Sequence, residues 1–175
     1  MALGLLIDLD KCTECGRIRE CAIECSYPFH PSNTGITAVR EAAAFAGVCR
    51  RCEEGTCIDA CPRDALERDE QGVVHRHNLR CISCGSCVLA CPFGTIQLET
   101  IPYALSLCDV CEGRLAPGEL PVCIGTCPEN ALSFVDLDSL DDEWVQRVTP
   151  GIAVRAVSWR LGEERAAERH AGGKR

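Results

Sequence analysis

Short stretches in which apolar and polar residues alternate are spread along the chain and are separated by loops. Residues 3–10 (LGLLIDLD) and 131–137 (ALSFVDL) are predicted strands on this pattern. Residues 64–81 predict a strand, a turn at DEQG and a second strand, and 95–101 (TIQLETI) predict a further strand. The pattern therefore indicates a mixed, α+β fold.

The remaining stretches have helical or charged character. Residues 38–47 (AVREAAAFAG) favour a helix by propensity. Near the C-terminus, 138–148 predict a helix with an acidic cap, 151–161 predict a strand, and 162–175 predict a charged helix that frays into a tail.

Cysteine gives the chain its internal repeat. The 175 residues include sixteen cysteines, all of which fall into four motifs. Each motif opens with C-x2-C and closes with C-x3-C, and Pro62, Pro92 and Pro128 follow three of the four closures. The motifs are Cys12, Cys15, Cys21 and Cys25; Cys49, Cys52, Cys57 and Cys61; Cys81, Cys84, Cys87 and Cys91; and Cys108, Cys111, Cys123 and Cys127.

The third motif, CISCGSCVLACP, shows what this spacing can bind. C-x2-C-x2-C puts three thiolates on one tight loop that can hold three corners of a cubane, whereas a single zinc more often takes two separate C-x2-C pairs. Cys87 and Cys91 are one helical turn apart, and Pro92 should end that helix. The fourth thiolate is thereby carried away from its neighbours, as in two-cluster ferredoxins, where it binds the other cluster. Four complete motifs predict four [4Fe-4S] clusters.

A disulfide framework is the alternative use of so many cysteines. The N-terminus has no basic region, long apolar run or twin-arginine pair, and no later stretch has the roughly 18 apolar residues of a membrane span. We therefore expect a cytoplasmic protein, in which metal ligands are favoured over disulfides. Zinc, the rival without redox chemistry, would leave the protein colourless.

Composition and charge further narrow the class of protein and its possible partners. Aromatic residues make up only 5% of the chain, so the organic core is thin and clusters are expected to serve as part of it. The formal net charge is −8 with neutral cysteines. Sixteen thiolates around four oxidised [4Fe-4S]²⁺ cores would take it to about −16. This charge disfavours nucleic acid and anionic membranes as partners.

The order of the motifs, the long fourth motif CDVCEGRLAPGELPVCIGTCP and the chain length resemble the four-cluster iron-sulfur subunits of the DMSO reductase family. The resemblance covers about residues 3–136. It implies two bacterial-ferredoxin-like modules, each with two clusters, in which the outer motifs pair with each other and the inner motifs pair with each other. By analogy with this family, 38–47 could also be an extended arm.

The resemblance also implies the ligands of each cluster. The four quartets would be A (Cys12, Cys15, Cys21, Cys127), B (Cys108, Cys111, Cys123, Cys25), C (Cys49, Cys52, Cys57, Cys91) and D (Cys81, Cys84, Cys87, Cys61). The first motif departs from the family pattern. Ile18 stands where the usual third cysteine would be, Cys21 comes one turn later, and Ser26 replaces the closing proline.

Three units follow from this pairing. Residues 1–30 and 102–136 would form the outer module, and residues 45–101 the inner module. Residues 137–175 lie beyond the resemblance and are expected to serve partner contact or self-association.

The expected function is electron transfer without catalysis. The sequence has no G-x-G-x-x-G, no phosphate loop and no C-x3-C-x2-C triplet. We expect a subunit that relays electrons between a catalytic oxidoreductase subunit and a redox acceptor. The first candidate partner is a molybdenum- or tungsten-pterin enzyme that oxidises an aldehyde or formate, followed by hydrogenase and carbon monoxide dehydrogenase. A free polyferredoxin shuttle and a self-assembling multi-cluster wire are the alternatives.

A few residues outside the motifs have open roles. His75 and His77 are expected at the surface rather than as ligands. Trp144 and Trp159 could anchor a partner or fold back over the thin core. Arg50 and Arg51 could tune a cluster potential, but a solvated pair is the favoured interpretation.

Overall fold

The computed structural model describes residues 3–12, 15, 21, 24–25, 33–103 and 105–159. Its strands are β1 (Leu3–Asp8), β2 (Leu66–Arg68), β3 (Val74–Arg76), β4 (Leu132–Asp136), β5 (Val145–Thr149) and β6 (Ile152–Arg155). Its helices are α1 (Leu9–Cys12), α3 (Gly35–Gly47), α4 (Thr56–Asp59), α5 (Ser86–Ala90) and α6 (Val122–Gly125), with the 3₁₀ helices η2 (Leu98–Tyr103) and η3 (Leu137–Ser139).

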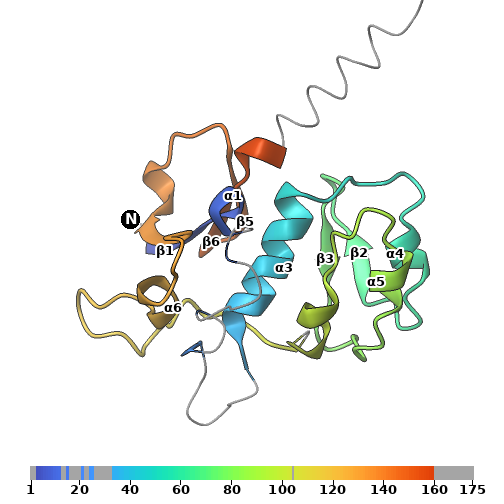
Figure 1. Cartoon of the computed structure of the whole chain (residues 1–175), viewed down its shortest axis with the longest axis horizontal. Coiled ribbons are helices and arrows are strands. Elements are labelled where there is room, and N and C mark those ends of the chain that lie inside the picture. The colour runs from blue at the N-terminus through green and yellow to red at the C-terminus, as the bar shows by residue number, and fades with distance from the viewer. Residues whose placement is uncertain are drawn as a thin grey trace, which may run out of the picture.

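These elements form two sheets with α3 between them (Figure 1). The four-stranded sheet has the order β4-β1-β6-β5, and the second sheet pairs β2 with β3. The α+β class predicted from the sequence is confirmed, as are the strands in 3–10, 131–137 and 151–161 and the hairpin in 64–81. In the part of the chain that is described, no helix is long and apolar enough to cross a membrane.

Strand β1 lies between two strands from the second half of the chain, β4 and β6. It is antiparallel to β4 and parallel to β6, so that Leu5 lies opposite Phe134 on one side and Ile152 on the other. Gly4 allows this close contact, because a Cβ at its position would lie 2.6 Å from the carbonyl oxygen of Gly151. Residues 145–155 are therefore part of the sheet that carries the first motif. Their predicted role in partner contact stays a prediction.

Residues 38–47 form a helix, as part of α3, and not an extended arm. Its buried side chains include Ile36, Val39, Ala43 and Ala46, which recur at helical spacing. At its start, a Cβ on Gly35 would lie 2.7 Å from the carbonyl oxygen of Leu107. The glycine thus lets the helix begin directly against the segment that leads into the fourth motif.

The strand predicted at 95–101 is wrong. Thr95 and Ile96 are buried, the next three residues are exposed, and Thr100 and Ile101 are buried again. That spacing belongs to a helical turn rather than a strand. The segment ends in the 3₁₀ helix η2, whose Pro102 has no N–H to offer a neighbouring strand.

The helix predicted at 138–148 is also wrong. Only the short turn η3 forms there, and β5 follows it, paired antiparallel with β6. The Asp142 carboxylate accepts hydrogen bonds from the Trp144 N–H and from Arg155 Nε, which holds the chain in a turn before β5. Pairing with β6 therefore overrides the local preference. The charged helix predicted at 162–175 lies outside the described residues.

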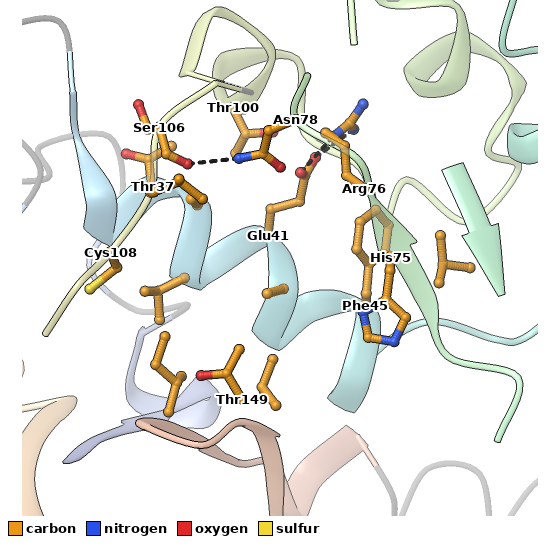
Figure 2. A pocket seen from close by; sticks show the side chains of 17 residues that line it. Thr37, Glu41, Phe45, His75, Arg76, Asn78, Thr100, Ser106, Cys108 and Thr149 are labelled. Atoms are coloured by element: carbon orange, nitrogen blue, oxygen red, sulfur yellow. Dashed lines mark hydrogen bonds and ion pairs between the residues drawn. The ribbon is translucent and has the colours of Figure 1, made fainter. Parts of the chain in front are cut away.

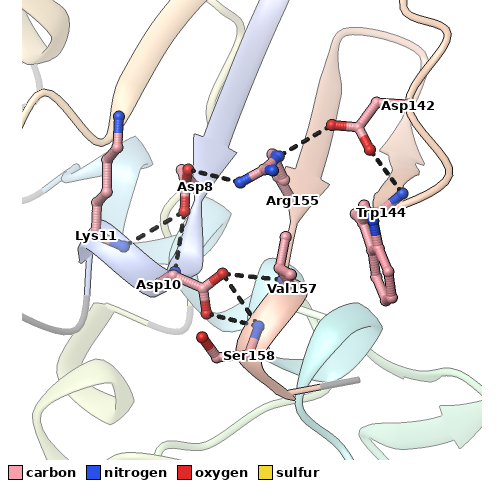
Figure 3. Close-up of polar contacts among 8 residues, drawn as sticks. All are labelled: Asp8, Asp10, Lys11, Asp142, Trp144, Arg155, Val157 and Ser158. Carbon is pink, nitrogen blue, oxygen red and sulfur yellow. Dashed lines mark hydrogen bonds and ion pairs between the residues drawn. The ribbon is translucent and has the colours of Figure 1, made fainter. Parts of the chain in front are cut away.

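Polar bonds attach this C-terminal segment to the end of β1 (Figure 3). The Asp10 carboxylate accepts hydrogen bonds from the N–H groups of Val157 and Ser158 at 2.9 and 3.1 Å. The Arg155 guanidinium donates to Asp8 Oδ2 at 3.3 Å. Because Asp8 and Asp10 closely precede Cys12, these bonds also fix the entry to the first motif.

We predict that Asp10→Ala lowers the free energy of unfolding by about 1 to 2 kcal/mol, because two backbone N–H groups lose a charged acceptor. Thermal unfolding of the anaerobically purified protein measures this loss. Asp138→Ala is the matched control, since the Asp138–Arg147 ion pair is exposed and its loss should cost less than about 0.5 kcal/mol. Equal effects in the two variants would contradict the role given to Asp10.

Candidate metal centres

The sixteen cysteines all lie among the described residues and all carry free thiols. Three of the C-x2-C loops share one backbone feature. The residue before the second cysteine has a positive φ in each, 51° at Arg51, 56° at Ser83 and 55° at Val110. A side chain rarely takes this left-handed conformation, so its recurrence marks a loop shape that the motif requires.

This loop shape turns peptide N–H groups toward sulfur. The N–H of Ser83 donates to Cys81 Sγ and that of Val110 to Cys108 Sγ, both at 3.4 Å. Such bonds stabilise a thiolate, and hydrogen bonds to sulfur are among the features that set the potential of an iron-sulfur cluster.

The closing half of the motif repeats as well. The third residue after the last cysteine is left-handed in the second, third and fourth motifs, and it is a residue that tolerates this conformation: Asp64 (48°), Gly94 (65°) and Asn130 (49°). In two of these closures the next N–H reaches sulfur, from Ala65 to Cys61 at 3.2 Å and from Ala131 to Cys127 at 3.3 Å.

The predicted helical turn between the last two cysteines of the third motif is confirmed. The N–H of Cys91 donates to the carbonyl oxygen of Cys87 at 3.1 Å, and α5 ends at Ala90, directly before Cys91, whose backbone is extended. Burial alone would raise the pKa of Cys91, but N–H groups after Pro92, led by that of Thr95, outweigh it and leave the pKa lowered. The closing loop thus favours the thiolate form of this ligand.

One cavity is lined by cysteines from the first and the fourth motif. Cys12, Cys15, Cys21 and Cys127 line it together with Arg40 of α3. These four cysteines are the residues of quartet A. They meet because β1 precedes the first motif, β4 follows the fourth, and the two strands are paired.

A second cavity brings together the residues of quartet D. Its walls include Cys61, Cys81, Cys84 and Cys87, together with Arg76 at the end of β3. Cys61 comes from the second motif and the others from the third. The Thr56 hydroxyl donates to the carbonyl oxygen of Ala90 at 2.9 Å, which holds α4 of one motif against α5 of the other.

The other two groups are close enough for their charges to interact. Burial raises the pKa of Cys123 to about 12, and the charges of Cys25, Cys108, Cys111 and, least, Cys21 contribute to this rise. Burial also raises the pKa of Cys57, and the charges of Cys91 and Cys49 add to it. Members of quartets B and C thus lie near one another, with Cys21 of quartet A also near Cys123.

Within the described residues, no group of three or more His, Cys, Asp or Glu side chains has the arrangement that would hold a metal ion. The cysteines of quartets A and D line two small cavities instead, and each set contains the four thiols that ligate a [4Fe-4S] cluster in proteins.

Two further observations fit such a cluster. Burial, followed by the charges of Cys127 and Cys12, raises the pKa of Cys21 to about 11, so this thiol stays protonated unless positive iron balances its charge. Arg40 Nη1 is buried and lacks an acceptor among the described residues, although Nη2 donates to Gln97 Oε1 at 3.4 Å. Cluster sulfur is a suitable acceptor for that N–H.

Neither of the arginines that line these cavities is predicted from the sequence. Arg40 and Arg76 lie on secondary structure between the motifs, and nothing in their local sequence distinguishes them from surface arginines. The pair that the sequence does single out, Arg50 and Arg51, is exposed. Arg50 lies over the Phe93 ring, 5.8 Å from its centre.

The histidines and tryptophans occupy the following positions. His75 pairs with Asp69 at 2.8 Å and His77 pairs with Glu67, and both histidine side chains are more than a third exposed, as expected for surface residues. Trp159 lines a cavity of about 180 Å³ together with Cys12 but is itself 42% exposed, so both roles considered for it stay open.

The comparisons with known proteins agree with the geometry. The 4Fe-4S dicluster domain family matches residues 40–137, which contain the second, third and fourth motifs. The uncharacterized ferredoxin-like protein YdhX of Escherichia coli O157:H7 is 38% identical over 127 residues, 68% of this chain and 57% of the relative. The chain spans about half the length of YdhX in two strains.

Two further relatives have more specific names. The thiosulfate reductase electron transfer subunit PhsB of Salmonella typhi is 37% identical over 128 residues, 72% of this chain and 67% of PhsB. One polypeptide of the anaerobic dimethyl sulfoxide reductase of Escherichia coli (strain K12) is 29% identical over 158 residues, 78% of this chain and 75% of the relative. The resemblance inferred from the motifs is confirmed. The matched segment covers more than half of the chain. The chain therefore belongs to the 4Fe-4S dicluster domain family.

Proposed function

We propose that the chain is a non-catalytic electron-transfer subunit that holds four [4Fe-4S] clusters and relays electrons between a catalytic oxidoreductase subunit and a redox acceptor. The observation that carries the proposal is the gathering of cysteines from different motifs around shared cavities, in a chain of the 4Fe-4S dicluster domain family.

Quartets A, B, C and D are the proposed ligand sets. The two cavities support A and D, and the mutual effects of cysteine charge support B and C. Each bound cluster would supply reversible one-electron redox chemistry, which cysteine alone does not offer. The cysteines hold iron, the peptide N–H groups stabilise the thiolates, and apolar side chains such as Ile7, Ile36 and Leu132 limit water around quartet A.

A cavity between the modules supports a continuous route. The cavity of about 180 Å³ is lined by Cys12 of quartet A and, across it, by Thr95, which bonds to Cys91 of quartet C. Arg40 lines both this cavity and that of quartet A. We propose that the outer and inner modules exchange electrons near these residues.

The proposed partner is a catalytic oxidoreductase subunit. The name of PhsB, an electron transfer subunit of a reductase, supports a dedicated partner over a free shuttle. A molybdenum- or tungsten-pterin enzyme that oxidises an aldehyde or formate is the first candidate, with hydrogenase and carbon monoxide dehydrogenase as alternatives. We propose a cytoplasmic location for the complex.

Size-exclusion chromatography with mass measurement, on protein made in its native host, tests this partner. We expect a brown complex with a second, larger polypeptide. A brown monomer would instead indicate a shuttle, and a brown homo-oligomer a self-assembled wire; either result would contradict the proposed partner.

Cys21 provides the sharpest test of the ligand sets, because its motif departs from the family pattern. We predict that Cys21→Ser lowers iron from about 16 per chain to roughly 12 to 15, since one cluster is lost or converted. Chemical iron analysis of anaerobically purified protein measures this change.

Cys25→Ser is the matched control, because Cys25 belongs to quartet B. It should disturb a different signal in the EPR spectrum of the reduced protein. Full iron content and an unchanged spectrum in Cys21→Ser would rule out quartet A as assigned.

Arg40 gives a further prediction. Arg40→Gln removes a positive charge from the cavity of quartet A, so the cluster bound there should become harder to reduce, with iron content still about 16 per chain. An EPR-monitored redox titration measures the potential, and the signal lost in Cys21→Ser identifies the cluster. Arg147→Gln, which removes an exposed ion pair, is the control. Unchanged potentials in Arg40→Gln would contradict this role.

A further inference from the structure

Arg76 is a charged residue beside the cysteines whose side chain is largely shielded from solvent. Only 5% of its side chain is exposed, and 13% of its partner Glu41. Arg76 Nε and Nη2 each donate to one oxygen of Glu41 at 2.7 Å. The same guanidinium donates to Cys81 Sγ at 3.4 Å and to Cys87 Sγ at 3.7 Å.

The two partners come from different elements. Glu41 lies on α3 and Arg76 at the end of β3, and the two side chains pair directly in the wall of a cavity of about 230 Å³ (Figure 2). A bidentate pair of this kind fixes the plane of the guanidinium. Glu41 therefore fixes the direction in which the remaining N–H groups of Arg76 point toward sulfur.

Arg76 stays protonated, and so positively charged, in this position. Burial alone would lower its pKa, but the hydrogen bonds and charge of Glu41 outweigh burial and leave the pKa raised. The guanidinium thus bonds to two of the four cysteines in quartet D.

We propose that Glu41 and Arg76 together set the reduction potential of the cluster held by quartet D, with Glu41 positioning Arg76 and partly balancing its charge. This inference rests on the proposed function, because it requires a cluster at quartet D. It assigns a role to two residues that lie outside the cysteine motifs and that act through the ligands.

The sign of each contribution follows from charge. A guanidinium next to the thiolates stabilises the more negative, reduced state, and so it raises the potential. The Glu41 carboxylate bonds to the guanidinium and not to sulfur, so its negative charge opposes that effect more weakly. Because both side chains are buried, solvent screens these charges less than it would at the surface.

Two substitutions should therefore shift one potential in opposite directions. In Arg76→Gln we expect the reduced-to-oxidised ratio of this cluster at a given potential to fall at least tenfold, which is a downward shift of about 59 mV for one electron. In Glu41→Gln we expect an upward shift, because an amide oxygen can still accept a bond from Arg76 while the negative charge is removed.

The experiment is an EPR-monitored redox titration of the full chain, in which dithionite supplies electrons and ferricyanide withdraws them. The signal disturbed by Cys84→Ser identifies the cluster of quartet D. Arg147→Gln is again the control and should leave every potential unchanged. A loss of stability without a direct effect on the cluster would not give shifts of opposite sign.

The possible outcomes separate the two proposals. Potentials that stay unchanged, or that move in the same direction in both variants, overturn this inference while wild-type protein still holds about 16 iron per chain. Wild-type protein that holds no iron-sulfur cluster overturns the proposed function itself. Should Arg76→Gln fail to fold, Glu41→Gln alone decides, since an unchanged or lowered potential in that variant also overturns the inference.

Discussion

Peptide N–H groups bond to cysteine sulfur at both ends of the cysteine loops, for example at 3.2 Å from Ala65 to Cys61 and at 3.4 Å from Ser83 to Cys81. Each bond involves a residue with left-handed backbone. Asp64 directly precedes the donor Ala65, and Ser83 is itself the donor. An α-helix or a regular strand would use the same N–H groups internally. The loops remain irregular because sulfur, instead of a backbone carbonyl, accepts these hydrogen bonds. The cavities are lined by these irregular loops.

The same constraint explains why distant segments must meet. One loop presents only three thiols on one side, and the fourth leaves at the closing helical turn, so each cavity draws its last cysteine from another motif. The β1–β4 pairing brings Cys127 to the first motif, and the α4–α5 contact brings Cys61 to the third. Helix α3 contributes Arg40 to one cavity, and its Glu41 pairs with Arg76 of β3, which lines the other.

The cysteine motifs and most strands were predictable from the sequence, because both are local signals. Residues such as Leu5 and Ile7 mark β1 by their own pattern, and Pro92 marks the end of α5. Tertiary effects were not predictable in this way. The strand at 145–149 forms because β6 offers an edge, and the segment that ends in η2 buries Ile96 and Ile101 with three exposed residues between Ile96 and Thr100.

Some residues of the candidate site could likewise be predicted from the sequence, and others could not. Its cysteines could be recognised by spacing, whereas the pairing of motifs came only from the resemblance to a family. Arg40, Glu41 and Arg76 carry no motif, and their importance appears only when α3 and β3 are folded against the loops. Buried charge next to sulfur is a property of the assembled structure, so a single sequence gives no signal for it.

All four cysteine groups are proposed to hold a [4Fe-4S] cluster, although the family is named for a dicluster domain. Native mass spectrometry of the anaerobically purified protein counts the clusters directly. We expect a mass higher than that of the apoprotein by four [4Fe-4S] units. Saturation with two clusters, or zinc in place of iron and sulfide, would contradict the proposal.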